Sequence, residues 1–409
     1  MPLFSLPNEL LILIAHSLNR KDLTSLRECN RRLDALLTSV LHGPIQRDRL
    51  LLWAAKNGYT LLAKRMVERG ANIAAQSRTG STALHEVAAG RNGVGVKILV
   101  DLGADVAALD HGGRTALHRA VEDHLNSDTV GQLLDLKAPV DARDNHGKTA
   151  LHWAVCFHEE NLAKLLIDRG SDVSICDKEG RTPLHLAALG GYGATTLLLL
   201  RKGADVNFQA DGGRTALHAA VRNYQRAMVR LLLQNGADVA ARDGQGKTAL
   251  HWAARQENAG IAGDLVAVGG DIAARDNCGR TVLHEATHSR DVETIRMVKR
   301  FGSSFDVCDD DGNTALHLAA LEGSDLVIGV LLKLGADIAV RNHRGKTALH
   351  VAAGCGLEDT VKALLRQGAD VAARDGDGKT ALELAVIQKH STVVQMFRNN
   401  NARSGRIFF

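Results

Sequence analysis

The sequence predicts an all-α protein built as a stack of short repeated units, and three observations indicate this fold class. Its 409 residues exceed the usual size of one hydrophobic core. The 40 glycines beside only 5 prolines suit many short helices separated by glycine turns. The pattern Thr-x-Leu-His recurs nine times at almost constant spacing. A repeat array explains all three observations, because each unit needs to bury its apolar face only against its neighbours.

The repeated pattern has a period of 33 residues. It begins at Thr82, Thr115, Thr149, Thr182, Thr215, Thr248, Thr281, Thr314 and Thr347, with one interval of 34 residues between Thr115 and Thr149. A tenth copy begins at Thr380, where Glu383 replaces the histidine, and a degenerate copy precedes the series at residues 49–81. These copies predict about eleven units with short hairpin-like turns between them. At the longer interval we expect an altered loop, with Pro139 standing where Gly-Ala is usual.

Each unit should contain two short helices. Thr248 can accept a hydrogen bond from the free N–H groups of a first helix, and Leu250 and Ala253 then recur at helical spacing. Residues 225–235 show an apolar stripe typical of a second helix, and Gly236 follows where a left-handed cap is favoured. The apolar faces of two such helices are too small to be stable alone, so they must pack against adjacent units.

The unit resembles the ankyrin repeat, whose 33-residue period carries the signature T-P-L-H-x-A. Residues 182–187, Thr-Pro-Leu-His-Leu-Ala, match this signature without change. We assign residues 46–398 to an ankyrin-repeat solenoid, with residues 380–398 as its polar capping unit and residues 399–409 as a C-terminal tail. The resemblance implies a concave surface that binds a protein partner.

A helical module at residues 1–45 lies outside the period and resembles an F-box. That family opens with Leu-Pro-x-Glu-Leu and continues with apolar residues at helical spacing. The matching positions, which would form its partner surface, are Leu6, Pro7, Leu10, Ile14, Leu18, Leu23 and Leu26. The resemblance implies binding of the Skp-type linker subunit of a cullin-based ubiquitin ligase. The residues alone leave an alternative, in which these helices only cover the open end of the stack.

The residue before each threonine forms a second row of candidate contacts. Eight of its ten members are basic: Arg114, Lys148, Arg181, Arg214, Lys247, Arg280, Lys346 and Lys379. Stacked units would align them into a positive edge that favours an acidic protein segment. An aspartate lies four residues earlier in seven of the ten turns, so the alternative is a row of solvated and partly neutralised turn residues.

Further candidates follow the Ala-Ala pair of the first helix, at positions that the ankyrin family uses for partner contact. They include Arg222, Arg255, His288 and Glu322, and they vary between units as a recognition surface should. Trp53, Trp153 and Trp252 follow the repeated histidine or its equivalent. We expect these tryptophans to pack in the core, with interface anchoring as the alternative.

The motif content argues against an enzyme, and we expect no catalytic residues, metal or cofactor. Nine of the 18 histidines hold one equivalent place per unit. Helices packed about 8–10 Å apart keep such residues too distant to share a zinc ion. Their expected role is a hydrogen bond to turn backbone between units. No phosphate-binding loop or nucleophile–base pattern stands out from the repeat.

Charge and cysteine usage set the remaining expectations. A net charge of +4 is weak for nucleic-acid binding, and the inner positions lack aromatic platforms for base stacking. Six cysteines without a C-x-x-C pair favour an intracellular protein, cytoplasmic or nuclear. The apolar run at residues 10–15 is too short to span a bilayer.

The ankyrin and F-box resemblances together predict an adaptor, monomeric by itself, that recruits a protein substrate to a ubiquitin ligase. The alternative is an ankyrin scaffold or sequestering protein with no ubiquitin link.

Overall fold

The computed structural model describes residues 44–122 and 126–404 of the chain. These residues form 22 helices, α3 to α24, and no strand, apart from one isolated bridge between Arg374 and Thr380. The predicted all-α repeat architecture is therefore confirmed for this part of the chain. The F-box-like residues Leu6, Pro7, Leu10, Ile14, Leu18, Leu23 and Leu26 all lie outside the described residues.

The helices fall into two compact units that divide near residues 183–205. The first unit contains α3 (Pro44–Lys56), α4 (Thr60–Glu68), α5 (Ala83–Ala89), α6 (Gly93–Asp101), α7 (Ala116–Glu122), α8 (Ser127–Asp135), α9 (Ala150–Cys156) and α10 (Glu160–Asp168). At the division lie α11 (Pro183–Gly190) and α12 (Gly193–Arg201). The second unit continues with α13 (Ala216–Arg222), α14 (Arg226–Gln234), α15 (Ala249–Arg255), α16 (Ala259–Ala267), α17 (Val282–His288), α18 (Val292–Arg300), α19 (Ala315–Leu321), α20 (Asp325–Lys333), α21 (Ala348–Gly354), α22 (Glu358–Arg366), α23 (Ala381–Ile387) and α24 (Ser391–Ser404).

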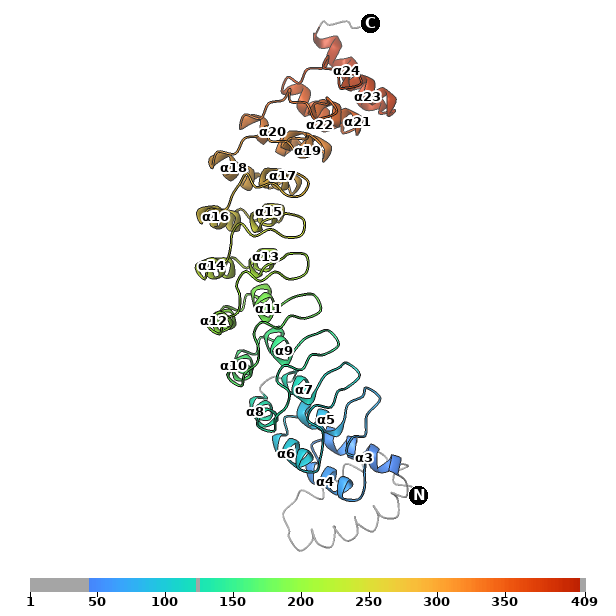
Figure 1. The fold of residues 1–409 in the computed structure, drawn as a ribbon. Coiled ribbons are helices and arrows are strands. Elements are labelled where there is room, and N and C mark those ends of the chain that lie inside the picture. The colour runs from blue at the N-terminus through green and yellow to red at the C-terminus, as the bar shows by residue number, and fades with distance from the viewer. Residues whose placement is uncertain (1–43, 123–125, 405–409) are drawn as a thin grey trace. The chain divides into compact units, whose positions relative to one another are not determined.

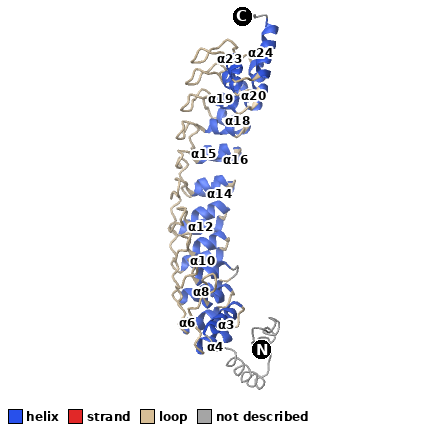
Figure 2. Cartoon of the chain, turned by 90° about the vertical axis from the view of Figure 1, so that its right-hand side faces the viewer, coloured by secondary structure: helices blue, strands red, loops and turns tan. Residues whose placement is uncertain are grey.

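Within each unit the helices form two rows. The first helices of successive repeats pack on one another, as α15 does on α17, and the second helices form a parallel row, as α14 and α16 do (Figure 1). The turns that join the repeats all leave from one side of the helices (Figure 2). First helices of seven residues and second helices of nine recur in most repeats, and a threonine cap begins first helices such as α9, α15 and α19.

The small apolar residues of the first helices allow this close packing. Leu250, Ala253 and Ala254 of α15 are completely buried, as the sequence predicts. In α14, which forms within the apolar stripe predicted at residues 225–235, Val229 and Leu232 are buried and Leu231 is only partly buried. Alanine at the helix contact brings two backbones close together, so the short helices still bury their apolar faces.

The irregular repeat differs from its prediction at one position. Counted with the 34-residue offset, Lys137 replaces the repeated Gly103 and has a φ of 66°, and Pro139 replaces Asp105. Pro139 therefore does not stand in the Gly-Ala place, because Ala138 keeps that alanine. The additional residue falls between the end of α7 at Glu122 and the start of α8 at Ser127.

Two predicted domain boundaries fall inside helices. The limit between residues 45 and 46 lies within α3, which begins at Pro44, and the limit at residue 398 lies within α24, which continues to Ser404. Proline is favoured in the first helical turn, where its missing N–H costs nothing, so the helix starts before the repeat pattern becomes visible.

Candidate functional site

Threonine and histidine form a constant frame at the start of each first helix. In the α15 repeat, the Thr248 N–H donates to His251 Nδ1 at 3.2 Å, and the Thr248 hydroxyl lies 2.9 Å from the same nitrogen. His251 Nε2 then lies 3.2 Å from the carbonyl oxygen of Arg280 in the next turn. Since Nδ1 accepts from a backbone N–H, Nε2 carries the proton and donates to that carbonyl.

This histidine bridge occurs in nine repeats, and it confirms the predicted role of the repeated histidine. The bridging residues are His85, His118, His152, His185, His218, His251, His284, His317 and His350. Each is bound to a neighbouring turn, and eight of them are also bound within their own cap, as His251 is. Within the part of the chain that the structure describes, no group of three histidine, cysteine or acidic side chains is placed to hold a metal ion.

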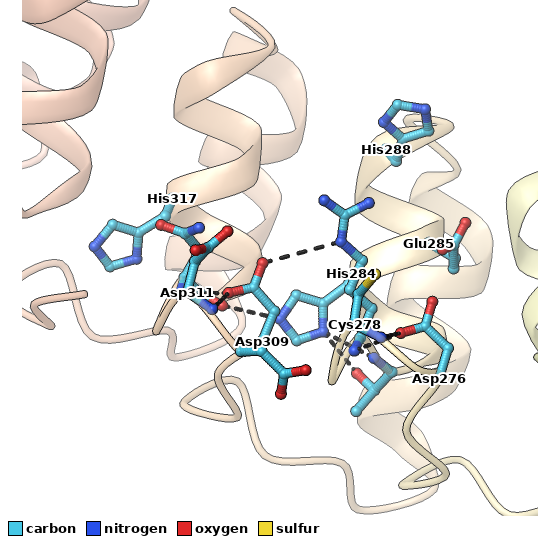
Figure 3. Close-up of polar contacts among 12 residues, drawn as sticks. Asp276, Cys278, His284, Glu285, His288, Asp309, Asp311 and His317 are labelled. Carbon is cyan, nitrogen blue, oxygen red and sulfur yellow. Dashed lines mark hydrogen bonds and ion pairs between the residues drawn. The ribbon is translucent and has the colours of Figure 1, made fainter. Parts of the chain in front are cut away.

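Burial keeps eight of these imidazoles neutral. It lowers the pKa of His152 to about 4, outweighing the hydrogen bond to the Arg181 carbonyl and the attraction of Asp177. The same cause lowers the pKa of seven further bridging histidines: His85, His118, His218, His251, His284, His317 and His350. Figure 3 shows His284 next to the turn residue Asp309, whose charge opposes the shift only in part.

The turn aspartates are structural. Asp243 Oδ1 accepts from the backbone N–H groups of Gln245 and Lys247, both at 2.9 Å, and its Oδ2 accepts from the Trp252 indole at 2.9 Å. Asp144 accepts from the Trp153 indole in the same way, at 2.9 Å. The two tryptophans are only partly buried, which differs from the predicted core packing, because the indole N–H is bound to a carboxylate at the edge of the turn.

Much of the predicted basic row is neutralised by ion pairs. In the first unit, Arg114 lies 2.9 Å from Asp110 and 2.5 Å from Glu122. Arg181 pairs with Asp177 at 2.8 Å, and Lys148 lies over the Trp153 ring, 4.9 Å from its centroid. These cations support their own turns, so they contribute less positive charge to the surface than the sequence alone indicates.

The second unit contains a buried carboxylate between two of the predicted cations. The Glu285 side chain is 1% exposed, and it lies 2.8 Å from Lys247 and 3.0 Å from Arg255. Burial would raise the pKa of Glu285, but the hydrogen bonds and charges of Lys247 and Arg255 hold it below its usual value. Lys247 and Arg255 are thus fixed in place by a residue that the sequence analysis did not select.

Other predicted contacts are arranged in three ways. Arg280 lies 3.9 Å from Asp309, and His288 pairs with Glu322 of the next repeat. Arg214 and Arg222 are exposed, and neither side chain has a hydrogen-bond or ion-pair partner within residues 44–122 and 126–404. Arg214 lacks the usual pairing because Ala210 stands where most turns have aspartate. Both arginines are therefore available to a partner.

A groove with an apolar floor and a polar edge, which the sequence analysis missed, lies over the first helices α19, α21 and α23. It is a cavity of about 320 Å³, with Leu318, Val351 and Leu384 along the three helices and Leu321 and Gly354 at two helix ends. Its signal was present in the sequence: the equivalents of Leu318 and Leu321 two repeats earlier are Trp252 and Arg255. Only comparison of equivalent positions across repeats would have revealed this local loss of charge.

Among the helices of residues 44–122 and 126–404, none combines the length and apolar content needed to cross a bilayer.

The match to a family model agrees with this geometry. The family model of ankyrin repeats matches residues 51–144, 125–210, 193–276, 258–342 and 328–406. No curated protein matches the sequence. A similar solved structure is described as the "Crystal structure of the ankyrin repeat domain of Bcl-3: a unique member of the IkappaB protein family". It is 30% identical, with a TM-score of 0.48, and the match covers 53% of this chain and 100% of that chain. The ankyrin matches span most of the sequence, and the chain belongs to the ankyrin-repeat family of protein-interaction scaffolds.

Proposed function

We propose that this protein is an adaptor that binds a protein substrate on its ankyrin repeats and the Skp-type linker subunit of a cullin ubiquitin ligase through its F-box-like N-terminus. One observation carries the substrate-binding half. A constant Thr–His frame holds nine of the first helices, while the position at the helix end changes from Arg222 to Arg255 to His288 to Leu321. A rigid frame with variable side chains suits recognition of one particular protein surface.

The ligase half rests on the F-box-like residues and on how the first ankyrin repeat is built. Helices α3 and α4 pack on α5 and α6, and Leu51, Ala54 and Met66 are buried there. This pair already covers the N-terminal face of α5 and α6. That arrangement favours a docking role for Leu10 and Ile14 over the alternative in which they only cover the stack.

The experiment is co-purification of the full-length chain with a Skp-type linker subunit. We expect Leu10→Asp with Ile14→Asp to abolish the association, because two buried charges would disrupt an apolar docking helix. The matched control is Val94→Asp with Leu326→Asp, since these side chains are 67% and 68% exposed. The control should bind normally, and both proteins should keep the helical circular dichroism of the parent.

A scaffold with no ubiquitin link makes the opposite prediction. In that case the intact chain does not associate with the linker subunit, or the Leu10/Ile14 double variant binds as well as the parent. Either result would remove the ligase half of the proposal and leave the ankyrin surface as a protein-binding scaffold. The proposal also places the protein inside the cell, which fits the five free cysteines of the described residues: Cys156, Cys176, Cys278, Cys308 and Cys355.

A further inference from the structure

The groove over α19, α21 and α23 has an apolar floor. Leu318 and Leu384 are 6% and 9% exposed, and Val351 lies between them on α21. The three residues follow one another at the 33-residue period, so three neighbouring repeats present the same kind of side chain. At about 320 Å³, the cavity is at the lower end of the range for ligand sites, which leaves room for one or two side chains.

The groove is open at Gly354 because this residue has no side chain. Leu321 and Ile387 hold the equivalent position in the repeats before and after, and each is 52% exposed. A Cβ added at Gly354 would meet no atom within 4 Å. The missing side chain therefore leaves a gap between two exposed apolar residues, where an apolar side chain of a partner could be buried.

The polar edge of the groove is positive because one turn lacks its aspartate. Asn342 stands where most turns have aspartate, and its Oδ1 accepts from the backbone N–H groups of Arg344 and Lys346, both at 3.0 Å. Across the groove-lining turns, Arg344 and Lys346 have no ion pair within residues 44–122 and 126–404. Asp311 is the one acidic side chain in the lining, so the lining carries two cations and one anion.

A pair of asparagines adds a hydrogen-bond donor beside these cations. In two other repeats the residue before the threonine lies near the aspartate of the next turn: Lys247 is 3.9 Å from Asp276, and Arg280 is 3.9 Å from Asp309. Here Asn342 donates to Asn313 Oδ1 at 2.9 Å instead. The side-chain amide N–H groups of Asn313 have no acceptor among the described residues, so they can donate to a carbonyl oxygen of an extended chain.

We propose that this groove binds an extended segment of a partner protein that presents a leucine-sized apolar side chain beside an aspartate or glutamate. The apolar side chain fills the gap at Gly354, and the carboxylate lies against Lys346 and Arg344. The inference deepens the substrate-binding half of the proposed function and rests on it. The apolar floor and the net positive edge together define the chemistry of the segment.

The test uses a displayed library of random twelve-residue peptides, selected on the immobilised full-length protein. We expect enriched peptides to share a large apolar residue within two positions of an acidic one. A labelled synthetic copy of an enriched peptide then reports affinity by fluorescence anisotropy. Gly354→Leu should weaken binding about tenfold or more, since it fills the gap that the peptide side chain needs. Leucine also favours a helix more than glycine does, so the variant should fold.

Gly329→Leu is the matched control. Gly329 lies in α20, and an added Cβ there also meets no atom within 4 Å, but the residue does not line the groove. This variant should bind the peptide like the parent. Lys346→Gln should weaken an acidic peptide about threefold and its amide analogue hardly at all, whereas Lys333→Gln on α20 should change neither.

Three results would overturn the inference. The first is a selection in which the library yields no enriched peptide. The second is that the enriched peptides bind the Gly354→Leu variant as tightly as the parent. The third is a dimer, detected by light scattering, that this variant dissociates. The last result would mean that a second copy of the chain occupies the groove. If the groove fails while the Leu10/Ile14 variant still loses the linker subunit, the adaptor proposal stands without this site.

Discussion

At the scale of single residues, the repeated histidine combines two tasks. Its Nδ1 accepts from the threonine that caps its own helix, and its Nε2 donates to a carbonyl of the next repeat. Within residues 44–122 and 126–404, Glu383 performs only the first of these tasks. Its carboxylate accepts from the Thr380 N–H at 2.7 Å, which completes the same capping box without a second bridge.

This difference predicts an asymmetric exchange. His251→Glu should destabilise the protein by about 2–4 kcal/mol, because it places a carboxylate against the Arg280 carbonyl and removes a buried donor. Glu383→His should leave stability almost unchanged, since the histidine can still accept from Thr380. Urea unfolding followed by circular dichroism measures both changes. Equal destabilisation by the two substitutions would contradict the bridging role of Nε2.

At the scale of elements, the turns and the helix ends use glycine for different reasons. Gly345 has a φ of 69°, and a Cβ there would lie 2.5 Å from the Gly376 nitrogen of the next turn. Gly335 follows α20 with a φ of 100°, but an added Cβ would meet nothing within 4 Å. Lys137 occupies the position after α8 that is equivalent to Gly335, so this position accepts a side chain. The turn position of Gly345 differs, because the backbone of the next turn lies against it.

Alanine substitutions should separate these two reasons. Gly335→Ala should cost about 1 kcal/mol, which is the strain of a left-handed conformation alone. Gly345→Ala should lower the free energy of unfolding by about 2–3 kcal/mol, because the new Cβ both strains the backbone and displaces the neighbouring turn. The shift in the urea midpoint is the readout. A Gly335→Ala variant as unstable as Gly345→Ala would argue against close turn-to-turn contact as the deciding factor.

At the scale of the whole molecule, the neutral histidines couple stability to pH. An unfolded histidine titrates near 6.5, and the folded pKa of eight bridging histidines lies lower. Between the folded and unfolded values, the unfolded chain binds more protons than the folded chain. The free energy of unfolding therefore falls as pH falls through this window.

We expect the urea midpoint to be constant above about pH 7.5 and to fall steeply between about pH 6.5 and 4.5. With a folded pKa of about 4, His152 alone would account for about 3 kcal/mol once fully protonated. His152→Gln should flatten the profile in part, because it removes one titrating group. A midpoint that is unchanged from pH 7.5 to 5 would contradict the neutral bridging state.

Much of the frame could be predicted from the sequence because its interactions recur with the period. The Thr248–His251 cap lies within four residues, and the bridge from His251 to Arg280 joins adjacent repeats. Any residue that serves the same contact in every repeat becomes visible as a periodic pattern. The repeat number, the helix pairs and the bridging histidines were therefore available without coordinates.

The candidate binding surface was less predictable, because its chemistry depends on exceptions to the period. The sequence located Arg214 and Lys247 in one equivalent row, but only the structure distinguishes the exposed Arg214 from Lys247, which pairs with the buried Glu285. Lys247 and Glu285 are 38 residues apart, and their contact depends on side-chain geometry across two turns. The amino-acid sequence alone shows which residues build each repeat, whereas the packing of neighbouring repeats sets which cations stay unpaired and where Gly354 opens a groove. Contacts that recur with the period specify the Thr–His frame within a repeat and between adjacent repeats. Charge pairing and the shape of the surface arise only where neighbouring repeats bring unlike residues together.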